Sequence, residues 1–512
     1  MKQKKAAVYD RWLSTLGGGE QVAFAYAQAL FEVGYSVDLV TFKKVDVQQA
    51  EKKMGLSLKN INIRYLHESM TDNLSAVSEE YDIFINTSHL EYFPNRSKQG
   101  YLSVFFPAML HLSVFEYLKR ALFIPSFRKL FIYPSRYENF KFDQHIGRKI
   151  YKWLSHKSSI VFKDSIFDFK IALFFKYFTF SVIDQIKFFL DNKEIRPSNK
   201  VFYEKKNTVI FNFKGLDTKN KKFTIVLPEN EYSDEVALVS LTIPNIRYML
   251  YNIFKSLFPV WEMRLHGGPG VTKRSDLSSY NKIITISKFC QKWIYRYWGI
   301  KSEVLYPPVN VKNFHSAKTK RNIILHVGRF FITGHSKKQL ELVKIFKQIV
   351  SKHGINGWEL HFVGSVENGE THEKYFNKVK NEAKDFPVFF HQDISFNELK
   401  ELFAESKIYW HATGLDENED KNPVALEHFG ITTVEAMASG CVPVVINMGG
   451  QKEIVTNESG FRWNTRNELI EYTIKLIQND DTMVKMKLAA INRSRFFSKE
   501  NFKEKFIQII KN

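Results

Sequence analysis

Glu427 and Glu435 flank a predicted helix start in the stretch EHFGITTVEAMASGCVPVVINMGG, which covers residues 427–450. The helix is expected to begin at residues 430–432, and Gly440 is placed to end it, since glycine is the usual residue just past a helix C-terminus. A helix N-terminus carries free N–H groups and a partial positive charge, both of which suit a phosphate group. Carboxylates beside it can accept hydrogen bonds from sugar hydroxyls. Together these residues indicate a site for a sugar nucleotide.

Two cations precede this stretch in the same half of the chain. Arg329 follows a predicted strand at residues 323–327, and Lys337 begins the next predicted helix. Arginine offers a planar fork to phosphate oxygens, whereas lysine offers a point charge. Thr432 and Thr433, at the predicted helix start, can cap the helix or bind phosphate. These side chains add to the chemistry that a nucleotide diphosphate needs.

Strands and helices alternate along the second half of the chain. The predicted strands cover residues 323–327, 360–363, 388–390, 408–410 and 441–446, and the predicted helices cover about residues 337–351, 374–383, 397–404, 431–439 and 468–478. This alternation predicts a doubly wound α/β domain, whose ligands bind at the carboxyl ends of the strands. One more helix is expected at residues 498–512.

A glycine loop near the N-terminus lies between a predicted strand at residues 6–9 and a predicted helix at residues 21–32. A second strand at residues 37–41 completes a parallel α/β unit, so that Gly17, Gly18 and Gly19 lie at the carboxyl end of the first strand. The three glycines do not match the G-x-G-x-x-G fingerprint of dinucleotide sites, and a simple tight turn is the alternative to a ligand site. His89, just past a predicted strand, can face the same cleft, although a lone histidine is more often a packed or solvent-facing residue.

Residues 110–245 interrupt the α/β pattern. The stretch 166–190 is rich in Phe with interspersed Lys, which suits an amphipathic helix on an anionic bilayer. A helical insertion packed on its own core is the alternative. Residues 201–243 alternate apolar and polar side chains, which predicts antiparallel strands. We therefore expect an insertion that is helical first and β-rich afterwards.

The composition fits a basic protein of two or more domains. The chain has 512 residues, of which 44% are hydrophobic, and a formal net charge of +20. The charge favours phosphorylated substrates, a lipid surface or nucleic acid, unless the lysines are simply solvated surface. The two cysteines predict no disulfide framework and favour a cytoplasmic setting. The N-terminus lacks the apolar segment of a signal peptide, and no stretch of about 18 uncharged apolar residues predicts a transmembrane helix.

An acidic pattern just before Glu427 has the spacing of a calcium-binding loop. Asp416, Asn418, Asp420 and Glu427 match its first, third, fifth and twelfth positions. The sixth position requires a glycine for its sharp turn but is Lys421, and the flanking elements are a strand and a helix rather than two helices. We therefore expect no metal site here.

The motifs as a set resemble those of glycosyltransferase family 4, the retaining transferases of the GT-B fold. The match is carried by EHFGITTVE with its Glu-x7-Glu spacing, AMASGCVPVV, GGQKEIV, HVGRF with Lys337, LGGGE, FINTSH and ITISKFCQKWI. EHFGI is also similar to mannosyltransferases that extend lipid-linked oligosaccharides. The resemblance covers both halves of the chain but not residues 110–245.

The resemblance implies a role for each candidate residue. Arg329 and Lys337 would neutralise the nucleotide diphosphate of the donor, Glu427 would meet hydroxyls of the donor sugar, and Glu435 would bind the ribose hydroxyls. His89 resembles the family's histidine near the sugar, and His111 is a nearby rival. Backbone N–H groups would hold the distal phosphate at Gly430, Ile431, Thr432 and Thr433, and the cleft would be lined by Gly17, Gly18 and Gly19.

The resemblance also implies an architecture: two Rossmann-like doubly wound domains that face a cleft. The expected N-terminal acceptor domain covers residues 1–110 and 245–308, and the insertion covers residues 111–244. The expected nucleotide-sugar domain covers residues 309–490, and a C-terminal helix in residues 491–512 would pack back toward the N-terminal domain.

The implied function is transfer of a sugar, with retained anomeric configuration and without a metal or cofactor, from GDP-mannose or a UDP-sugar. The acceptor would be lipid-linked or a polysaccharide in cell-surface glycan synthesis, and the protein would be cytoplasmic and peripheral on the inner face of the cytoplasmic membrane. A sugar-nucleotide 2-epimerase of the same fold is one alternative. A non-enzymatic nucleic-acid-binding protein is another, although the charge is spread along the chain and no nucleic-acid motif is present.

Overall fold

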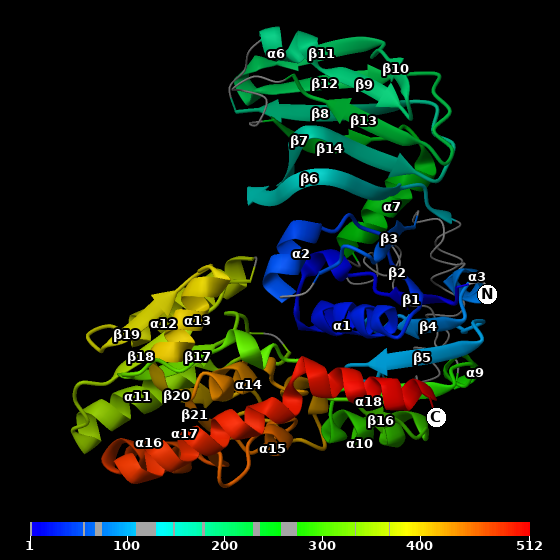
Figure 1. Cartoon of the computed structure of the whole chain (residues 1–512). Helices are drawn as coiled ribbons and strands as arrows, with labels where there is room; N and C mark the ends of the chain where they lie inside the picture. Colours follow the sequence, from blue (N-terminus) through cyan, green and yellow to red (C-terminus); the bar gives the residue numbers. More distant parts are fainter. Residues whose placement is uncertain are drawn as a thin grey trace. The chain divides into compact units, whose positions relative to one another are not determined.

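The computed structural model describes residues 3–54, 57–66, 74–108, 130–146, 149–176, 180–228, 236–257, 274–332, 334–367 and 369–511. The chain forms two compact units, of which the first comprises residues 1–111 and 272–512 and the second comprises residues 112–271. The first unit contains both α/β sheets (Figure 1), and the second is the insertion.

The N-terminal sheet of the first unit is parallel, as its alternation of strands and helices predicts. Its seven strands have the order β16-β15-β5-β4-β1-β2-β3. The strands are β1 (Lys5–Tyr9), β2 (Ser36–Thr41), β3 (Asn62–Tyr65), β4 (Ile83–Asn86), β5 (Gln99–Val104), β15 (Lys282–Thr285) and β16 (Glu303–Val304). The helices are α1 (Gly18–Glu32), α2 (Val47–Met54), α3 (Leu74–Glu79), α9 (Arg274–Leu277) and α10 (Lys288–Trp298). Apolar faces of β1, β2, β4 and α1 share one buried core.

The C-terminal sheet is also parallel, and its six strands have the order β19-β18-β17-β20-β21-β22. The strands are β17 (Arg321–Val327), β18 (Glu359–Val363), β19 (Val388–His391), β20 (Ser406–His411), β21 (Val442–Ile446) and β22 (Phe461–Trp463). The helices are α11 (Gln339–His353), α12 (Glu370–Glu382), α13 (Phe396–Glu405), α14 (Ile431–Ala438), α15 (Gln451–Ile454), α16 (Arg466–Gln478), α17 (Asp480–Ser494) and α18 (Lys499–Lys511). The predicted strands and helices of this half are confirmed to within a few residues, whereas β22, α15 and α17 were not predicted.

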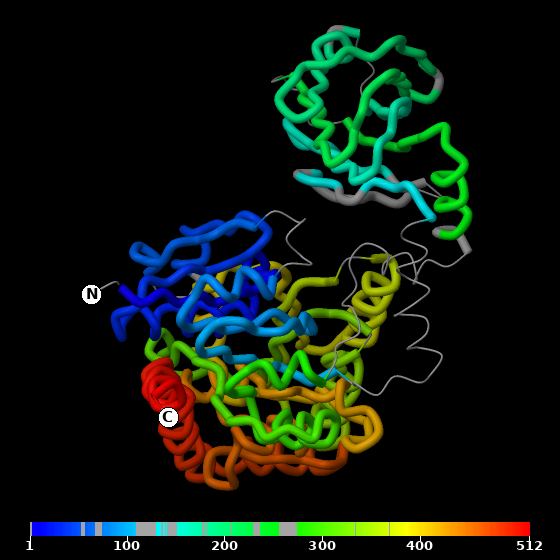
Figure 2. Tube along the Cα trace, turned by 90° about the vertical axis from the view of Figure 1, so that its right-hand side faces the viewer, coloured from blue at the N-terminus to red at the C-terminus, as the bar shows by residue number. Residues whose placement is uncertain are grey.

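The last helix, α18, returns to the N-terminal sheet. Phe502 and Phe506 pack their rings on Tyr26 of α1, at centroid distances of 5.1 and 4.8 Å. Lys503 also pairs with Glu32 at 2.7 Å. Figure 2 shows this helix in red within the first unit. The chain therefore closes back on the domain in which it begins, and α17 runs across the domain boundary expected at residue 490.

The insertion is built on a nine-stranded antiparallel sheet. Eight strands follow the order β10-β9-β13-β7-β14-β8-β12-β11, and β6 pairs with β7. The strands are β6 (Pro134–Ile146), β7 (Lys149–Phe162), β8 (Phe169–Phe175), β9 (Lys187–Leu190), β10 (Lys193–Ile195), β11 (Asn199–Tyr203), β12 (Thr208–Phe213), β13 (Lys222–Val226) and β14 (Val236–Thr242). The strands predicted at residues 201–243 are thereby confirmed.

The helix predicted over residues 166–190 is wrong for the described residues. They form β8, the short helix α6 (Phe180–Gln185) and β9. The apolar side chains of Phe169, Ile171, Leu173 and Phe175 recur every second residue and are buried on one face of the sheet. A period of two is that of a strand, and the density of Phe obscured it in the sequence.

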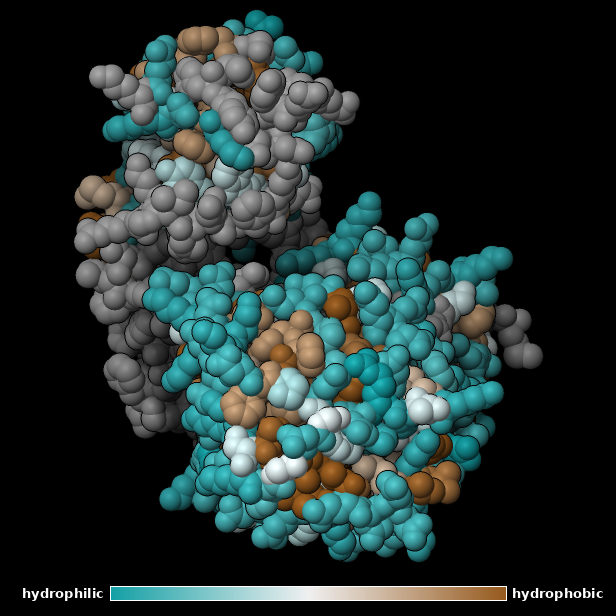
Figure 3. Space-filling view, turned by 90° about the vertical axis from the view of Figure 1, so that its left-hand side faces the viewer, coloured by the Kyte–Doolittle hydropathy of each residue, from teal (hydrophilic) through white to brown (hydrophobic). Residues whose placement is uncertain are grey.

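Helix α7 (Ile246–Leu257) follows the last strand of the insertion. Tyr248 and Tyr251 of α7 belong to the same buried cluster as the β8 side chains. The insertion was expected to end at residue 244, whereas its compact unit extends to residue 271. Across the described residues of both units, no helix is long and apolar enough to cross a membrane. The face drawn in Figure 3 is mostly hydrophilic over the described part of the first unit.

Candidate active site

Three side chains meet at the carboxyl edge of the C-terminal sheet. The Glu427 carboxylate accepts a hydrogen bond from Lys337 Nζ at 2.7 Å and lies 3.1 Å from His411 Nε2. Lys337 follows β17, His411 ends β20, and Glu427 precedes α14. Because β17 and β20 are neighbours in the sheet, their carboxyl ends bring these residues together. The structure thus joins two of the sequence-predicted residues and adds a third, His411.

The cluster fixes the protonation of Glu427. Burial alone would raise the pKa of this carboxyl, but the charge on Lys337 and the hydrogen bond from His411 hold the pKa well below 4.5. His411 is 2% exposed, and burial lowers its pKa despite its carboxylate partner. An ionised carboxylate can only accept, so the neutral His411 must donate from Nε2. Glu427 is therefore an anion held between a cation and a neutral donor.

The start of α14 is open toward the same cluster. Gly430 has a φ of 119°, a conformation that favours glycine, and a Cβ there would lie 2.2 Å from Gln451 Nε2. No described residue accepts a hydrogen bond from the backbone amides of Ile431 or Thr432. The hydroxyl of Thr433 is buried and has no partner in the described part of the chain. These groups are the donors that a phosphate at a helix N-terminus would use.

Glu435 lies one turn into α14 and is partly buried. Burial raises the pKa of its carboxyl to about 7, and no described residue supplies a counter-charge or a hydrogen bond to it. Glu427 and Glu435 therefore differ sharply: one is a paired anion and the other is half protonated near neutrality. A carboxyl without a partner can accept hydrogen bonds from ligand hydroxyls.

The N-terminal glycine loop reaches the same helix start. A Cβ on Gly18 would come within 2.9 Å of Ile431 Cδ1, so the backbone of the N-terminal domain lies directly against the first residue of α14. Gly17 donates its N–H to Glu20 Oε2 at 2.6 Å. A Cβ on Gly19 would only touch the ring of Phe105, at 3.4 Å. Of the three glycines, Gly18 is therefore the one at which the close approach to α14 leaves no room for a side chain.

Histidines gather on the side of the cluster that faces the N-terminal domain. The ring of His428 stacks on Phe106 at 4.3 Å and lies 6.5 Å from the ring of His335. Burial is the main reason that the pKa of His428 falls to about 4, and the nearby His335 and His89 lower it further. His89 is exposed, and it lies close enough to lower the pKa of both His335 and His428 through its charge. Its rival His111 lies outside the described residues.

Arg329 is placed differently from Lys337. Its guanidinium pairs with Glu367 at 2.6 Å, and its side chain is 58% exposed. Lys337, in contrast, packs its stem against Gly328, where a Cβ would lie 2.7 Å from Lys337 Cγ. The structure therefore brings Lys337, and not Arg329, into contact with Glu427.

The acidic residues of the calcium-like pattern are all engaged by cations. Asp416 pairs with Arg466, Asp420 with Arg296, and Glu427 with Lys337. Within the described ranges, no three His, Cys, Asp or Glu side chains gather as a metal site. Each of the three carboxylates in the pattern therefore pairs with a different cation, and they do not converge on one point.

Side chains on both sides of the cleft fix the loop that carries Glu427. Ser287 Oγ, at the start of α10, donates to the backbone oxygen of His428 at 2.7 Å. Glu453, at α15, accepts hydrogen bonds from the backbone amides of Lys288 and Phe289, each at 2.8 Å. A carboxylate from one domain therefore caps a helix of the other, which is a favourable use of a helix N-terminus.

Sequence reasoning missed His411, Gln451 and Glu453. His411 directly follows the predicted strand at residues 408–410, so its place at a carboxyl end was a usable signal. Gln451 and Glu453 lie within the motif GGQKEIV, but their contacts join segments distant in sequence. A pattern within one stretch of sequence cannot predict contacts between residues that are distant along the chain.

Comparisons with known proteins find similarity to glycosyltransferases. The family described as "Glycosyl transferases group 1" matches residues 310–493. A relative from Dictyostelium discoideum, named GDP-Man:Man(3)GlcNAc(2)-PP-Dol alpha-1,2-mannosyltransferase, is 26% identical over 295 residues, which are 55% of this chain and 54% of the relative. The human alpha-1,3/1,6-mannosyltransferase ALG2 is 26% identical over 188 residues, which are 32% of this chain and 40% of ALG2. The chain spans about half the length of the relatives that it matches.

Solved structures share the fold over nearly the whole chain. Anabaena Alr3699/HepE in complex with UDP and glucose has a TM-score of 0.52 at 10% identity, with coverage of 99% of this chain and 100% of that one. A glycosyltransferase from Rickettsia africae ESF-5 has a TM-score of 0.51 at 12% identity, with coverage of 99% and 98%. At such identities the likeness shows the fold alone, and that fold is GT-B. The chain is thus a GT-B protein whose residues 310–493 match the family described as glycosyl transferases group 1.

Proposed function

We propose that this protein is a retaining glycosyltransferase, which moves a sugar from a nucleotide-diphosphate sugar to a lipid-linked or polysaccharide acceptor in cell-surface glycan synthesis. The observation that carries the proposal is the Lys337–Glu427–His411 cluster beside the open start of α14. A cation, an oriented carboxylate and free helix amides are together the groups that a sugar diphosphate requires.

Each group has a part in donor binding. The amides of Ile431 and Thr432 hold the distal phosphate, and Lys337 lies next to it. Glu435 accepts hydrogen bonds from the ribose hydroxyls, and Glu427, fixed by its two partners, accepts them from the donor sugar. Arg329 can exchange Glu367 for a phosphate oxygen, since its side chain is exposed and long.

The reaction is a front-face substitution. The bond between the anomeric carbon and the diphosphate oxygen breaks, and the acceptor oxygen forms its bond on the same face, so the configuration is retained. The acceptor's proton passes to the leaving phosphate oxygen. Negative charge grows on the diphosphate as it leaves, and Lys337 with the helix amides stabilises that charge. The chain's own cations thereby supply the charge stabilisation that the step needs, and we propose that it proceeds without a metal.

GDP-mannose is the donor that we propose first. Relatives in several organisms carry GDP-Man or mannosyltransferase in their names, and EHFGI resembles the same proteins. UDP-sugars are the second choice. We place the protein in the cytoplasm, on the inner face of the cytoplasmic membrane, because a net charge of +20 suits an anionic surface and a lipid-linked acceptor lies there.

A thermal-shift screen of nucleotide sugars tests the donor. A ligand at a hundred times its Kd stabilises the native state by about 2.7 kcal/mol, so the preferred donor should raise the unfolding midpoint clearly. The same donor should then be consumed with a glycan acceptor, and the product should keep the anomeric configuration of the donor. If no nucleotide sugar shifts the midpoint, the proposal is wrong.

Two outcomes would favour the alternatives. A 2-epimerase would convert the donor sugar without any acceptor, which proton NMR of the donor alone reveals. A nucleic-acid-binding protein would retain DNA in a strongly salt-dependent manner and ignore nucleotide sugars.

A further inference from the structure

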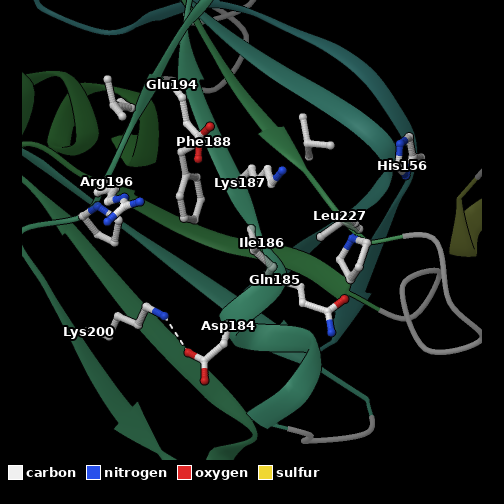
Figure 4. A pocket seen from close by; sticks show the side chains of 14 residues that line it. His156, Asp184, Gln185, Ile186, Lys187, Phe188, Glu194, Arg196, Lys200 and Leu227 are labelled. Atoms are coloured by element: carbon white, nitrogen blue, oxygen red, sulfur yellow. Dashed lines mark hydrogen bonds and ion pairs between the residues drawn. The ribbon is translucent and has the colours of Figure 1, made fainter.

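The insertion contains a pocket of about 810 Å³, within the range of small-molecule binding sites. Figure 4 shows its lining, which comes from α6, β9, β10, the start of β11, the middle of β7 and the end of β13. The sequence motifs of the active site do not extend into this unit, and none of the residues assigned to donor binding lines the pocket.

Basic side chains dominate the polar lining. Lys200 on β11 pairs with Asp184 of α6 at 2.8 Å, which holds one wall of the pocket in place. Lys187 and Arg196 are exposed, and neither has an ion-pair partner within the described ranges. Glu194 is the other acidic residue of the lining. With Lys200 and Asp184 neutralising each other, two cations and one carboxylate remain for a ligand.

The floor and one nearby edge are apolar. Ile186, Phe188 and Leu227 line the pocket and are buried in the core of the insertion. Phe202 lies two residues from Lys200, so both side chains project from the same face of β11. Its ring lies 5.5 Å from that of Phe180, and the two side chains are 40% and 54% exposed. Exposed rings beside a charged pocket provide flat surfaces for stacking.

We propose that this pocket binds an acidic saccharide, that is, a glycan that carries carboxylate or phosphate groups. The C–H faces of sugar rings suit the apolar floor and the two Phe rings, and sugar hydroxyls suit Asp184, Gln185 and Glu194. Lys187 and Arg196 then meet the anionic groups, since a charged hydrogen bond is stronger than a neutral one. The ligand class rests on the proposed function, because a glycosyltransferase builds or extends such chains.

The test uses the full-length protein and direct binding rather than transfer. A fluorescently labelled galacturonic acid hexamer is titrated and followed by anisotropy, beside neutral maltohexaose and a single-stranded oligothymidylate of equal charge. The expected result is that the acidic hexamer binds best, and that Lys187→Ala with Arg196→Ala weakens it roughly tenfold or more. Lys214→Ala with Lys219→Ala, two exposed lysines of the same unit outside the pocket, is the matched control and should change little.

The proposal is overturned if the acidic hexamer does not bind, if oligothymidylate binds equally or more tightly, or if both double variants lose binding equally. A carboxylate hexamer that binds while inorganic phosphate competes equally well would identify the ligand as the anion alone, which also contradicts a saccharide site. The unfolding midpoint of each variant, with and without GDP-mannose, separates this test from the donor site. If GDP-mannose still raises the unfolding midpoint while hexamer binding is lost, the proposed function stands and the pocket alone is affected. If the hexamer still binds while GDP-mannose no longer raises the midpoint, the pocket proposal stands and the donor site is affected.

Discussion

Helices α1 and α14 begin face to face, each after a glycine, and their starts are built differently. At α1 the carboxylate of Glu20 folds back to accept the N–H of Gly17 at 2.6 Å. At α14 no side chain caps Gly430, and the next two amides have no partner in the described part of the chain. One helix start is closed by its own carboxylate, and the other is open.

The difference assigns separate tasks to the two starts. At the start of α1 the carboxylate of Glu20 accepts the N–H of Gly17 and repels a phosphate, so this start can only approach a ligand through its backbone. The open start of α14 keeps both its free amides and its partial positive charge. Both helices follow a glycine, but only the start of α14 can bind a phosphate, whereas α1 only lines the site. The carboxylate of Glu20 at the start of α1 makes this difference.

The largest effect is expected for Lys337→Ala, which removes the cation beside the open start. Transfer should fall by about a hundredfold to a thousandfold, as for the loss of one stabilising donor in a transition state. The partly buried Glu427 also loses its counter-charge, which should cost about 1 to 3 kcal/mol of unfolding free energy. Initial rates and urea unfolding measure both quantities.

Lys338→Ala is the matched control for that variant, because Lys338 is the neighbouring lysine and pairs with Glu417 instead, at 3.3 Å. Its transfer rate should stay within about twofold to threefold of the unmodified protein, since a partly exposed pair contributes little. If the two variants lost transfer equally, the assignment of Lys337 to the diphosphate would be wrong.

Gly430→Ala should have the next largest effect, through geometry. A φ of 119° strains any residue with a side chain, and the new methyl would meet Gln451 Nε2. We expect donor affinity to fall roughly tenfold or more, measured by isothermal titration with GDP-mannose. Gly440→Ala strains the opposite end of the same helix, at a φ of 72°. Equal loss of donor affinity in the two variants would contradict a phosphate site at the start of α14.

The pH dependence of donor binding should report Glu435. Burial raises the pKa of its carboxyl to about 7, and hydrogen bonds from ribose hydroxyls favour the ionised form. Donor affinity should therefore fall by about tenfold between pH 8 and pH 6, because the ionised fraction falls by that factor. Glu435→Gln should bind more weakly at pH 8 and lose the slope. A slope of the same size in the Gln variant would assign the titration to another group.

The smallest effect is expected for Glu20→Gln, at the closed start. The side-chain amide can still accept the N–H of Gly17, so unfolding free energy should fall by only about 0.5 to 1 kcal/mol through the lost charge. Donor affinity should stay within about twofold, since the phosphate lies at α14. A clear gain in donor affinity would show that α1 also meets the phosphate and would remove the contrast between the two helices.

The sequence was informative where a structural signal is local. Glycines at helix ends, apolar strand runs and the spacing of Glu427 and Glu435 all act within about ten residues, and the elements they predicted in the C-terminal half are present. The same reasoning failed at residues 166–190, because the frequent Phe residues fit both the period of a helix and the period of a strand. Only the pairing of β8 with β12 and β14 selects the strand there.

The sequence by itself determined the α/β class of both halves, the start of α14 and the kinds of side chains beside it. The tertiary structure alone decided that His411 joins Lys337 at Glu427, that Gly18 lies against Ile431, and that Arg329 turns to Glu367. The physical reason is distance along the chain. Helix starts and strand periods arise from neighbouring residues, whereas these contacts join segments that meet only after both sheets have formed.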